Sequence, residues 1–189
     1  PWLDASKTSP YMFYQFWRNC EDEVVIHFLK ILTFIDASEV EEMQRALDQN
    51  AGKRLPQIKL AQEVTRIVHG NDGARAAERI TDALFSNEID SLAEDDLAQL
   101  ALDGMSSTDL SSSNVSLVEV LVSSGLAVTP RGDVTHGQAK KLIRSKAVSV
   151  NGKKVEDEEM VLSRDRALYD RYLIVQKGKK NHHLVIFGD

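Results

Sequence analysis

Cysteine is nearly absent from this chain, and long apolar stretches are missing. Cys20 is the single thiol among 189 residues, which excludes an internal disulfide framework and any zinc cluster built on several cysteines. No apolar run approaches the roughly 20 residues that a membrane-spanning helix needs. The sequence also lacks the basic start followed by an apolar core that is typical of a secretory signal. These absences predict a soluble, cytoplasmic protein with no membrane partner.

Sequence signatures of catalysis and of metal binding are missing as well. The chain contains no glycine-rich phosphate loop, nucleophile elbow or metal-ligand cluster. His27 and His69 lie in helical patterns without a second ligand at suitable spacing, and the adjacent His182 and His183 would project to opposite faces of a strand. We therefore predict no catalytic residue, no metal site and no cofactor in this chain.

Charge is distributed unevenly along the sequence. Residues 1–125 hold 10 Lys and Arg against 21 Asp and Glu, a formal charge of −11, whereas residues 126–189 hold 13 against 8, a charge of +5. The total of −6 conceals this asymmetry. A basic end joined to an acidic remainder is the pattern expected of a protein whose basic end meets phosphate.

Residues 1–104 carry the apolar periodicity of helices. Ser9-Pro10 is typical of a helix start, and Ser38 followed by Glu41 matches a capping box. Gly70 follows a further helix and can adopt the conformation that ends it. The sequence thus predicts a mainly α helical domain over residues 1–104.

The pattern changes after a serine-rich stretch, residues 105–116, which we interpret as a linker. The remainder, residues 117–189, alternates short apolar helices with β-type segments. Its expected elements are two helices near 117–124 and 137–145, a hairpin around Asn151-Gly152 and a final hairpin around 177–181. The predicted fold class is a mainly α helical domain followed by a small α+β module.

Basic residues concentrate on one helix and two turns of this module. Lys140 and Arg144 are four residues apart and share a helix face, and the Asn151-Gly152 turn would present further lysines beside it. Side chains cannot enter the deep, narrow groove of A-form RNA, so such a surface would recognise shape and phosphate position. The predicted RNA-binding residues are Lys140, Lys141, Arg144, Lys146, Asn151, Lys153, Lys154, Lys177, Lys179 and Lys180.

Several motifs resemble known families. The stretch HGQAKKLIRSKAVSVNGKKV resembles the RNA-binding fold named after ribosomal small-subunit protein four. The stretches WLDASKTSPYMFYQFWRN, EVTRIVHG, ITDALFSNEIDSL and KGKKNHHLVIF resemble the C-terminal part of bacterial-type tyrosyl-tRNA synthetase, in the same order and over nearly the whole chain. The resemblance implies a helical anticodon-binding domain and a module that grips the long variable arm of tRNA for tyrosine.

The same resemblance implies what a longer parent would add. The parent would attach tyrosine to tRNA through a tyrosyl-adenylate, with ATP and magnesium bound in a Rossmann-type catalytic domain that this chain lacks. The chain opens at Pro1 rather than Met, and we expect it to be a piece of that parent, inactive alone. We expect a monomeric fragment and a homodimeric parent, without a DNA partner.

The resemblance also implies an acidic residue, just after the FYQFW helix, that accepts hydrogen bonds from an anticodon base. Asp22 is the nearest match and Glu21 the rival. A carboxylate suits the amino and imino groups of guanine, although a first-turn acid favoured by the helix dipole explains Asp22 equally well. In the module, the stretch Pro130–Val134 departs from the family spacing and leaves the role of Arg131 open.

Two other classes of function fit parts of the pattern. One is a stand-alone RNA-binding or ribosome-associated module, which the full gene would distinguish. The other is a protein-interaction domain whose basic end contacts acidic protein surfaces. This last class predicts weak binding with no preference for tRNA over other polyanions.

Overall fold

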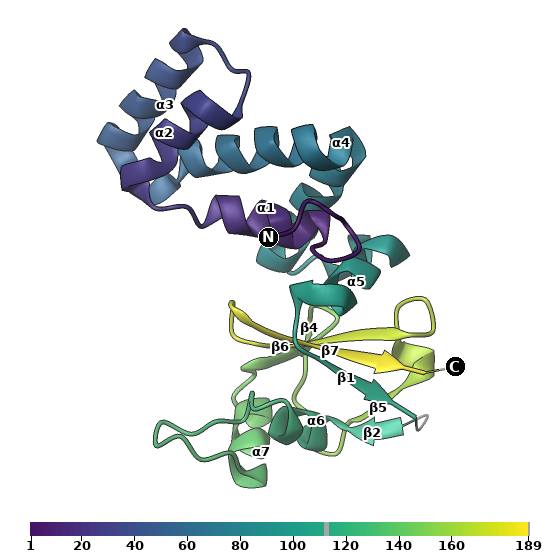
Figure 1. Ribbon diagram of the computed structural model, residues 1–189. Coiled ribbons are helices and arrows are strands. Elements are labelled where there is room, and N and C mark those ends of the chain that lie inside the picture. Colours follow the sequence, from purple (N-terminus) through teal and green to yellow (C-terminus); the bar gives the residue numbers. More distant parts are fainter. Residues whose placement is uncertain (112–113, 189) are drawn as a thin grey trace. The chain divides into compact units, whose positions relative to one another are not determined.

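The chain folds into two compact units in the computed structural model, which describes residues 1–111 and 114–188 (Figure 1). The first unit, Pro1–Thr81, is helical, and the second, Asp82–Asp189, combines helices with a five-stranded sheet. This confirms the predicted fold class, a mainly α helical region followed by an α+β region.

Four long helices make up most of the first unit. They are α1 (Pro10–Arg18), α2 (Asp22–Leu32), α3 (Ala37–Asn50) and α4 (Leu55–Ser86), with the short η1 (Ala51–Lys53) before α4. Gly70 interrupts α4 with a φ of 74°, which confirms the predicted stop, and a second helical stretch follows at once. Neither α4 nor any other helix of residues 1–111 and 114–188 has the length and apolarity that a membrane crossing needs.

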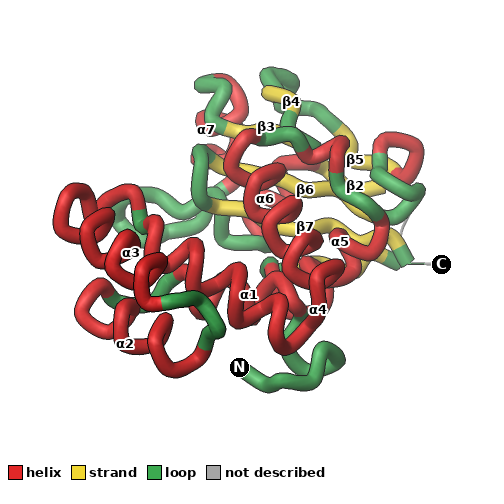
Figure 2. Tube along the Cα trace, turned by 90° about the horizontal axis from the view of Figure 1, so that it is seen from above, coloured by secondary structure: helices red, strands yellow, loops and turns green. Residues whose placement is uncertain are grey.

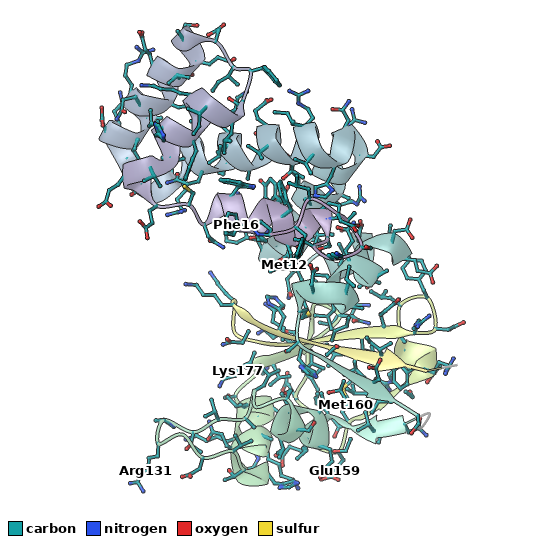
Figure 3. The ribbon with its side chains drawn as sticks, viewed as in Figure 1. Met12, Phe16, Arg131, Glu159, Met160 and Lys177 are labelled. Atoms are coloured by element: carbon teal, nitrogen blue, oxygen red, sulfur yellow. The ribbon has the colours of Figure 1, made fainter. Side chains whose placement is uncertain are left out.

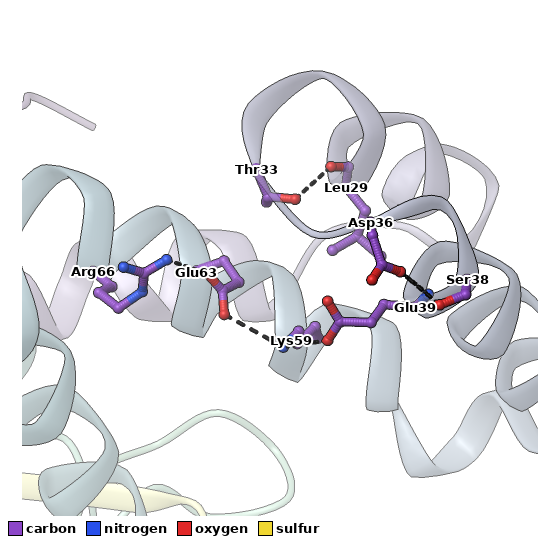
Figure 4. A network of polar contacts seen from close by, with 8 residues as sticks. All are labelled: Leu29, Thr33, Asp36, Ser38, Glu39, Lys59, Glu63 and Arg66. Carbon is purple, nitrogen blue, oxygen red and sulfur yellow. Dashed lines mark hydrogen bonds and ion pairs between the residues drawn. The ribbon is translucent and has the colours of Figure 1, made fainter.

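Local side-chain capping fixes where the first helices begin. Ser9 caps α1 as predicted, since its Oγ accepts a hydrogen bond from the Met12 amide at 3.1 Å. The predicted cap at Ser38 is wrong by two residues: Asp36 caps α3, and its carboxylate accepts from the Glu39 amide at 2.9 Å (Figure 4). Asp36 and Glu39 have the same three-residue spacing as Ser38 and Glu41, so the capping pattern occurred twice in overlapping registers.

A chain of ion pairs joins α3 to α4 in the same region (Figure 4). Lys59 Nζ lies 3.2 Å from a carboxylate oxygen of Glu39 and 3.3 Å from one of Glu63. Glu63 in turn pairs with Arg66 at 2.6 Å. Below these contacts the helices share an apolar core of Phe13, Val25, Leu29, Leu60 and Val64.

The second unit is built on a mixed sheet. Its helical elements are η2 (Ile89–Ser91), α5 (Glu94–Gln99), the π-helical turn η3 (Leu100–Gly104), α6 (Leu117–Ser123), α7 (His136–Arg144) and η4 (Arg164–Arg166). Its strands are β1 (Ser107–Leu110), β2 (Asn114–Ser116), β3 (Val148–Val150), β4 (Lys153–Lys154), β5 (Val161–Ser163), β6 (Tyr172–Lys177) and β7 (Asn181–Phe187). The strand order is β1-β7-β6-β3-β4, with β1 parallel to β7 and the other pairs antiparallel, while β2 pairs with β5 separately. Figure 2 shows β7, β6, β3 and β4 following one another across this sheet.

One apolar core connects α6 and α7 to this sheet. Leu121 of α6, Ile143 of α7 and Phe187 of β7 are fully buried members of the same cluster. Side chains that alternate along β6 and β7 supply the rest of that face, because a strand projects every second residue to the same side. The core therefore fixes α7, the predicted basic helix, against the sheet.

The serine-rich stretch differs from the linker that the sequence suggested. Ser107–Leu110 and Asn114–Ser116 are strands of the second unit, and residues 112 and 113 lie outside the described part of the chain. The buried His183 of β7 lies 2.9 Å from Ser106 Oγ and 2.8 Å from Thr108 Oγ1, and burial lowers the pKa of its imidazole. The hydroxyl groups of Ser106 and Thr108 thus hydrogen-bond to the buried imidazole of His183, a role that the serine-rich composition did not indicate.

Candidate RNA-binding interface

The turn at Asn151-Gly152 is held by contacts beyond its own two strands. Both residues have positive φ, 45° and 80°, as the predicted two-residue hairpin requires. Asn151 Oδ1 accepts from the Ile174 amide at 2.9 Å and Nδ2 donates to the Arg166 carbonyl at 3.3 Å, while Asn87 Nδ2 donates to the Gly152 carbonyl at 2.8 Å. Asn151 therefore uses its amide group inside the unit, where it positions the lysines that follow.

The basic face predicted on α7 is present, but acidic side chains meet it. Three cations of α7 and of the turn after it each form an ion pair with one short run, Glu156–Glu159, which we call the acidic segment. The pairs are Lys140 with Glu159 at 3.4 Å, Arg144 with Glu158, and Lys146 with Glu156 at 2.7 Å. The sequence prediction named these cations but not their acidic partners.

Arg144 and Glu158 form the most specific of these pairs. Arg144 donates from both Nε and Nη2, the second bond spanning 3.2 Å to Oε2. These hydrogen bonds to the charged form lower the pKa of Glu158, and the same contact raises the pKa of Arg144. Both groups therefore stay charged near neutral pH.

The cations of the β3–β4 hairpin differ in their surroundings. Lys153 Nζ lies 3.7 Å from Asp90 Oδ2, so this charge too has an acidic neighbour. Lys154 and, on α7, Lys141 are exposed and have no ion pair within the described residues. Lys141 and Lys154 can therefore meet a phosphate without displacing a carboxylate.

The turn between β6 and β7 carries three closely spaced lysines that form no ion pair among the described residues. Lys177 is half-buried, Lys179 and Lys180 are exposed, and none of the three has an ion pair in the part of the chain that the structure describes. The Gly178 amide donates to the Ala147 carbonyl at 3.0 Å, which places this turn beside the end of α7. The register pairs Val148 with Lys177 and Val150 with Val175, so this lysine turn and the Asn151-Gly152 turn lie at opposite ends of β3.

Arg166 is a cation that the sequence analysis missed. It lines two neighbouring hollows of about 640 and 430 Å³, together with Lys154, Val155 and Met160, which both hollows share. Arg166 belongs to η4, an element that no periodicity predicted. Its position near Lys154 adds a second charge to that end of the unit.

The stretch Pro130–Val134 forms a small exposed loop before α7. The Thr129 amide donates to the Asp133 carbonyl at 2.7 Å, and Val128 and Val134 form an isolated β-bridge. Arg131 extends from this loop into solvent (Figure 3). The departure from the family spacing is therefore accommodated by a hairpin-like loop that adds an exposed cation.

Asp22 begins α2 in the first unit. Its Oδ1 accepts from Gln57 Nε2 at 2.6 Å and lies 3.9 Å from Arg54 Nη1, while Oδ2 has no hydrogen-bond partner among the described residues. Arg54 also donates to the carbonyls of Arg18, at 3.1 Å, and of Cys20, at 2.8 Å. Contacts to Oδ1 therefore orient the Asp22 carboxylate, while Oδ2 can accept a hydrogen bond from a ligand. The rival residue, Glu21, is exposed and is the N-cap of α2, but its side chain makes no capping hydrogen bond.

Two family models match this chain. Residues 2–86 match the model described as tRNA synthetases class I (W and Y), and residues 96–185 match the Tyrosine--tRNA ligase SYY-like C-terminal domain. The first match covers the helices of the first unit, and the second covers most of the sheet and the basic helix.

Curated relatives show the same similarity over nearly the whole chain. A Tyrosine--tRNA ligase of Aliivibrio fischeri (strain MJ11) is 46% identical over 186 residues, which are 98% of this chain and 42% of that protein. The ligase of Pectobacterium carotovorum (strain PC1) is 44% identical over 185 residues, and that of Dechloromonas aromatica (strain RCB) is 42% identical over 184. Each alignment covers 97% of this chain and 42% of the relative, so the chain spans less than half the length of these proteins.

Proposed function

Because the chain belongs to the tyrosyl-tRNA synthetase family as its C-terminal portion, we propose that it is the tRNA-recognition region of a tyrosine-tRNA ligase. The first unit contacts the anticodon stem, and the second unit grips the long variable arm of tRNA for tyrosine. The parent enzyme attaches tyrosine to this tRNA in the cytoplasm, as a homodimer, whereas the fragment alone is monomeric.

The observation that carries the variable-arm proposal is the set of cations without an acidic partner. Within the described residues, Lys141, Lys154 and the three lysines of the β6–β7 turn have no ion pair. They lie on separate elements that one core holds in place, and a rigid array of positive charge can follow an RNA backbone. Binding supplies positioning, which lowers the entropic part of the reaction barrier in the parent.

The chemistry of tyrosine activation belongs, in this proposal, to parts of the parent outside these 189 residues. ATP and magnesium would serve the tyrosyl-adenylate step there. In residues 1–111 and 114–188, no group of three or more His, Cys, Asp or Glu side chains is arranged to hold a metal ion. We propose that the ATP-binding and magnesium-binding roles belong to those other parts of the parent, and we expect the fragment alone to be inactive.

Asp22 is the proposed acceptor for an anticodon base. Replacing it with asparagine (Asp22→Asn) should weaken binding of tRNA for tyrosine about tenfold, because a hydrogen bond to a charged acceptor contributes about 1.5 kcal/mol or more. Gln57 can still donate to the amide oxygen, so the fold should persist. Fluorescence anisotropy with labelled tRNA measures the change.

Glu21→Gln is the matched control, since it removes the same charge one residue away. It should leave the affinity within about twofold. A larger loss for Glu21→Gln than for Asp22→Asn would transfer the anticodon role to Glu21. Equal, small losses would leave Asp22 as a first-turn acid favoured by the helix dipole only.

The test of the function as a whole is the affinity of the purified chain for tRNA for tyrosine, against the same tRNA with its long variable arm deleted. We expect the intact tRNA to bind more tightly by at least about tenfold over a series of salt concentrations. Equal affinities, set by salt alone, would reduce the second unit to a nonspecific polyanion surface. If heparin competes equally well against the intact tRNA and the tRNA without its variable arm, the result would favour a protein-interaction module.

A further inference from the structure

The acidic segment and α7 are matched along their lengths. As the residue number rises from Lys140 to Arg144 to Lys146, the partner falls from Glu159 to Glu158 to Glu156. The acidic segment therefore runs antiparallel to the basic face and contacts it at three successive points. One stray surface contact would not produce this order.

The fold holds the acidic segment in place at both ends. Val155, just before it, is 7% exposed and belongs to the core of the second unit, and Met160, just after it, packs against the same core. Within the segment, the Glu159 amide donates to Asp157 Oδ1 at 2.9 Å and the Met160 amide donates to the Asp157 carbonyl at 3.3 Å. The carboxylates are thus presented by an ordered turn rather than by a free loop.

The three cations remain reachable by solvent while they are paired. The side chains of Arg144 and Lys146 are 67% and 61% exposed, and that of Lys140 is 41% exposed. In the Lys140–Glu159 and Lys146–Glu156 pairs the carboxylate is exposed as well, and such pairs contribute little to stability. A phosphate can therefore replace a carboxylate at small cost, but it must compete with that carboxylate first.

We propose that Glu156–Glu159 determines selectivity by competing with nucleic-acid phosphates for the cations of α7; this inference rests on the proposed function. A flexible single strand can adjust its shape to contact any unpaired cation, so its affinity depends mainly on how many cations are unpaired. Pairing three cations with carboxylates therefore lowers the affinity for a single strand more than the affinity for a folded tRNA. A folded tRNA contacts the surface in a fixed geometry and also meets the unpaired Lys141, Lys154 and the lysine turn. The acidic segment thereby favours a shaped RNA over an arbitrary polyanion.

The test substitutes the three pairing carboxylates together, as Glu156→Gln, Glu158→Gln and Glu159→Gln, and measures binding of poly(U) and of tRNA for tyrosine over a salt series. Three released cations should steepen the logarithmic salt dependence of poly(U) binding by about 2 units, at about 0.7 per cation for single strands, and raise its affinity about tenfold at low salt. The preference for tRNA over poly(U) should fall at least about threefold.

A matched control removes the same negative charge without releasing any cation. Glu41, Glu42 and Glu94 are exposed and have no ion pair among the described residues, so their change to glutamine should leave the salt dependence within about half a unit. In an Arg144→Ala background, adding Glu158→Gln should change the salt dependence no further, because the cation that it would release is absent.

The two probes separate failure of this inference from failure of the proposed function. If the salt dependence of poly(U) binding is the same in the triple variant and in the control, Glu156–Glu159 does not determine selectivity. This holds even if the unmodified chain prefers tRNA. An unchanged preference for tRNA would also overturn it. An unmodified chain that shows no preference for the arm-bearing tRNA would contradict the proposed function, whatever the poly(U) result.

Discussion

Replacing Gly152 with alanine (Gly152→Ala) is expected to lower the free energy of unfolding of the second unit by about 3 kcal/mol. Gly152 has a φ of 80°, a conformation that costs any other L-residue about 1–2 kcal/mol. A Cβ at this position would lie 2.3 Å from the carbonyl oxygen of Asn87, so the turn must shift. That shift breaks the hydrogen bond from Asn87 Nδ2 to the Gly152 carbonyl.

Gly178→Ala is the control for the backbone part of this effect. Gly178 also has a positive φ, 62°, but a Cβ added there would have no other heavy atom within 4 Å. This substitution should cost only about 1 kcal/mol. Hydrogen exchange of the β3 and β6 amides measures both changes within the second unit, and equal losses for the two variants would show that the close approach to Asn87 contributes nothing.

Removing the three lysines of the β6–β7 turn together, as Lys177→Ala, Lys179→Ala and Lys180→Ala, is expected to weaken tRNA binding on the order of a hundredfold at moderate salt. Each lysine that contacts a phosphate releases close to one counterion, so the logarithmic salt dependence should become shallower by about 2 to 3 units. These lysines have no ion pair among the described residues, so their full charge is available to RNA. Titrations of labelled tRNA at several salt concentrations give both quantities.

The matched set is the three cations that the acidic segment already neutralises, changed as Lys140→Ala, Arg144→Ala and Lys146→Ala. The loss of tRNA affinity should be several-fold smaller than the loss caused by removing the three lysines of the β6–β7 turn. The reason is that the carboxylates of the acidic segment already partly cancel the attraction of these cations for phosphate. A larger effect for this set would mean that α7 is the main contact and that its carboxylate partners have no influence on binding.

Features determined by neighbouring residues were predictable from the sequence. Ser9 could be assigned as a cap because capping needs only a side-chain oxygen and an amide three residues on. The Asn151-Gly152 turn could be assigned because few residue pairs tolerate two successive positive φ angles. Where the local signal repeats in overlapping registers, as at Asp36 and Ser38, the sequence does not decide between them.

Features that depend on distant contacts were not predictable in the same way. The acidic segment was visible in the sequence only as a charged run, and its alignment with α7 follows from how Val155 and Met160 pack into the core. Likewise, the hydroxyl groups of Ser106 and Thr108 hydrogen-bond to the ring of His183, which lies 75 or more residues away along the chain. The cations of the candidate site could thus be named, but which of them remain free required the fold.

The most direct test of the proposed function is crosslinking of the intact chain to tRNA for tyrosine, followed by mass-spectrometric identification of the joined peptides and nucleotides. We predict that peptides containing Lys177–Lys180 are joined to nucleotides of the variable arm, and that peptides around Asp22 are joined to the anticodon stem and loop. Crosslinks from the 177–180 turn that are spread evenly over the tRNA, or that are confined to regions other than the variable arm, would contradict it.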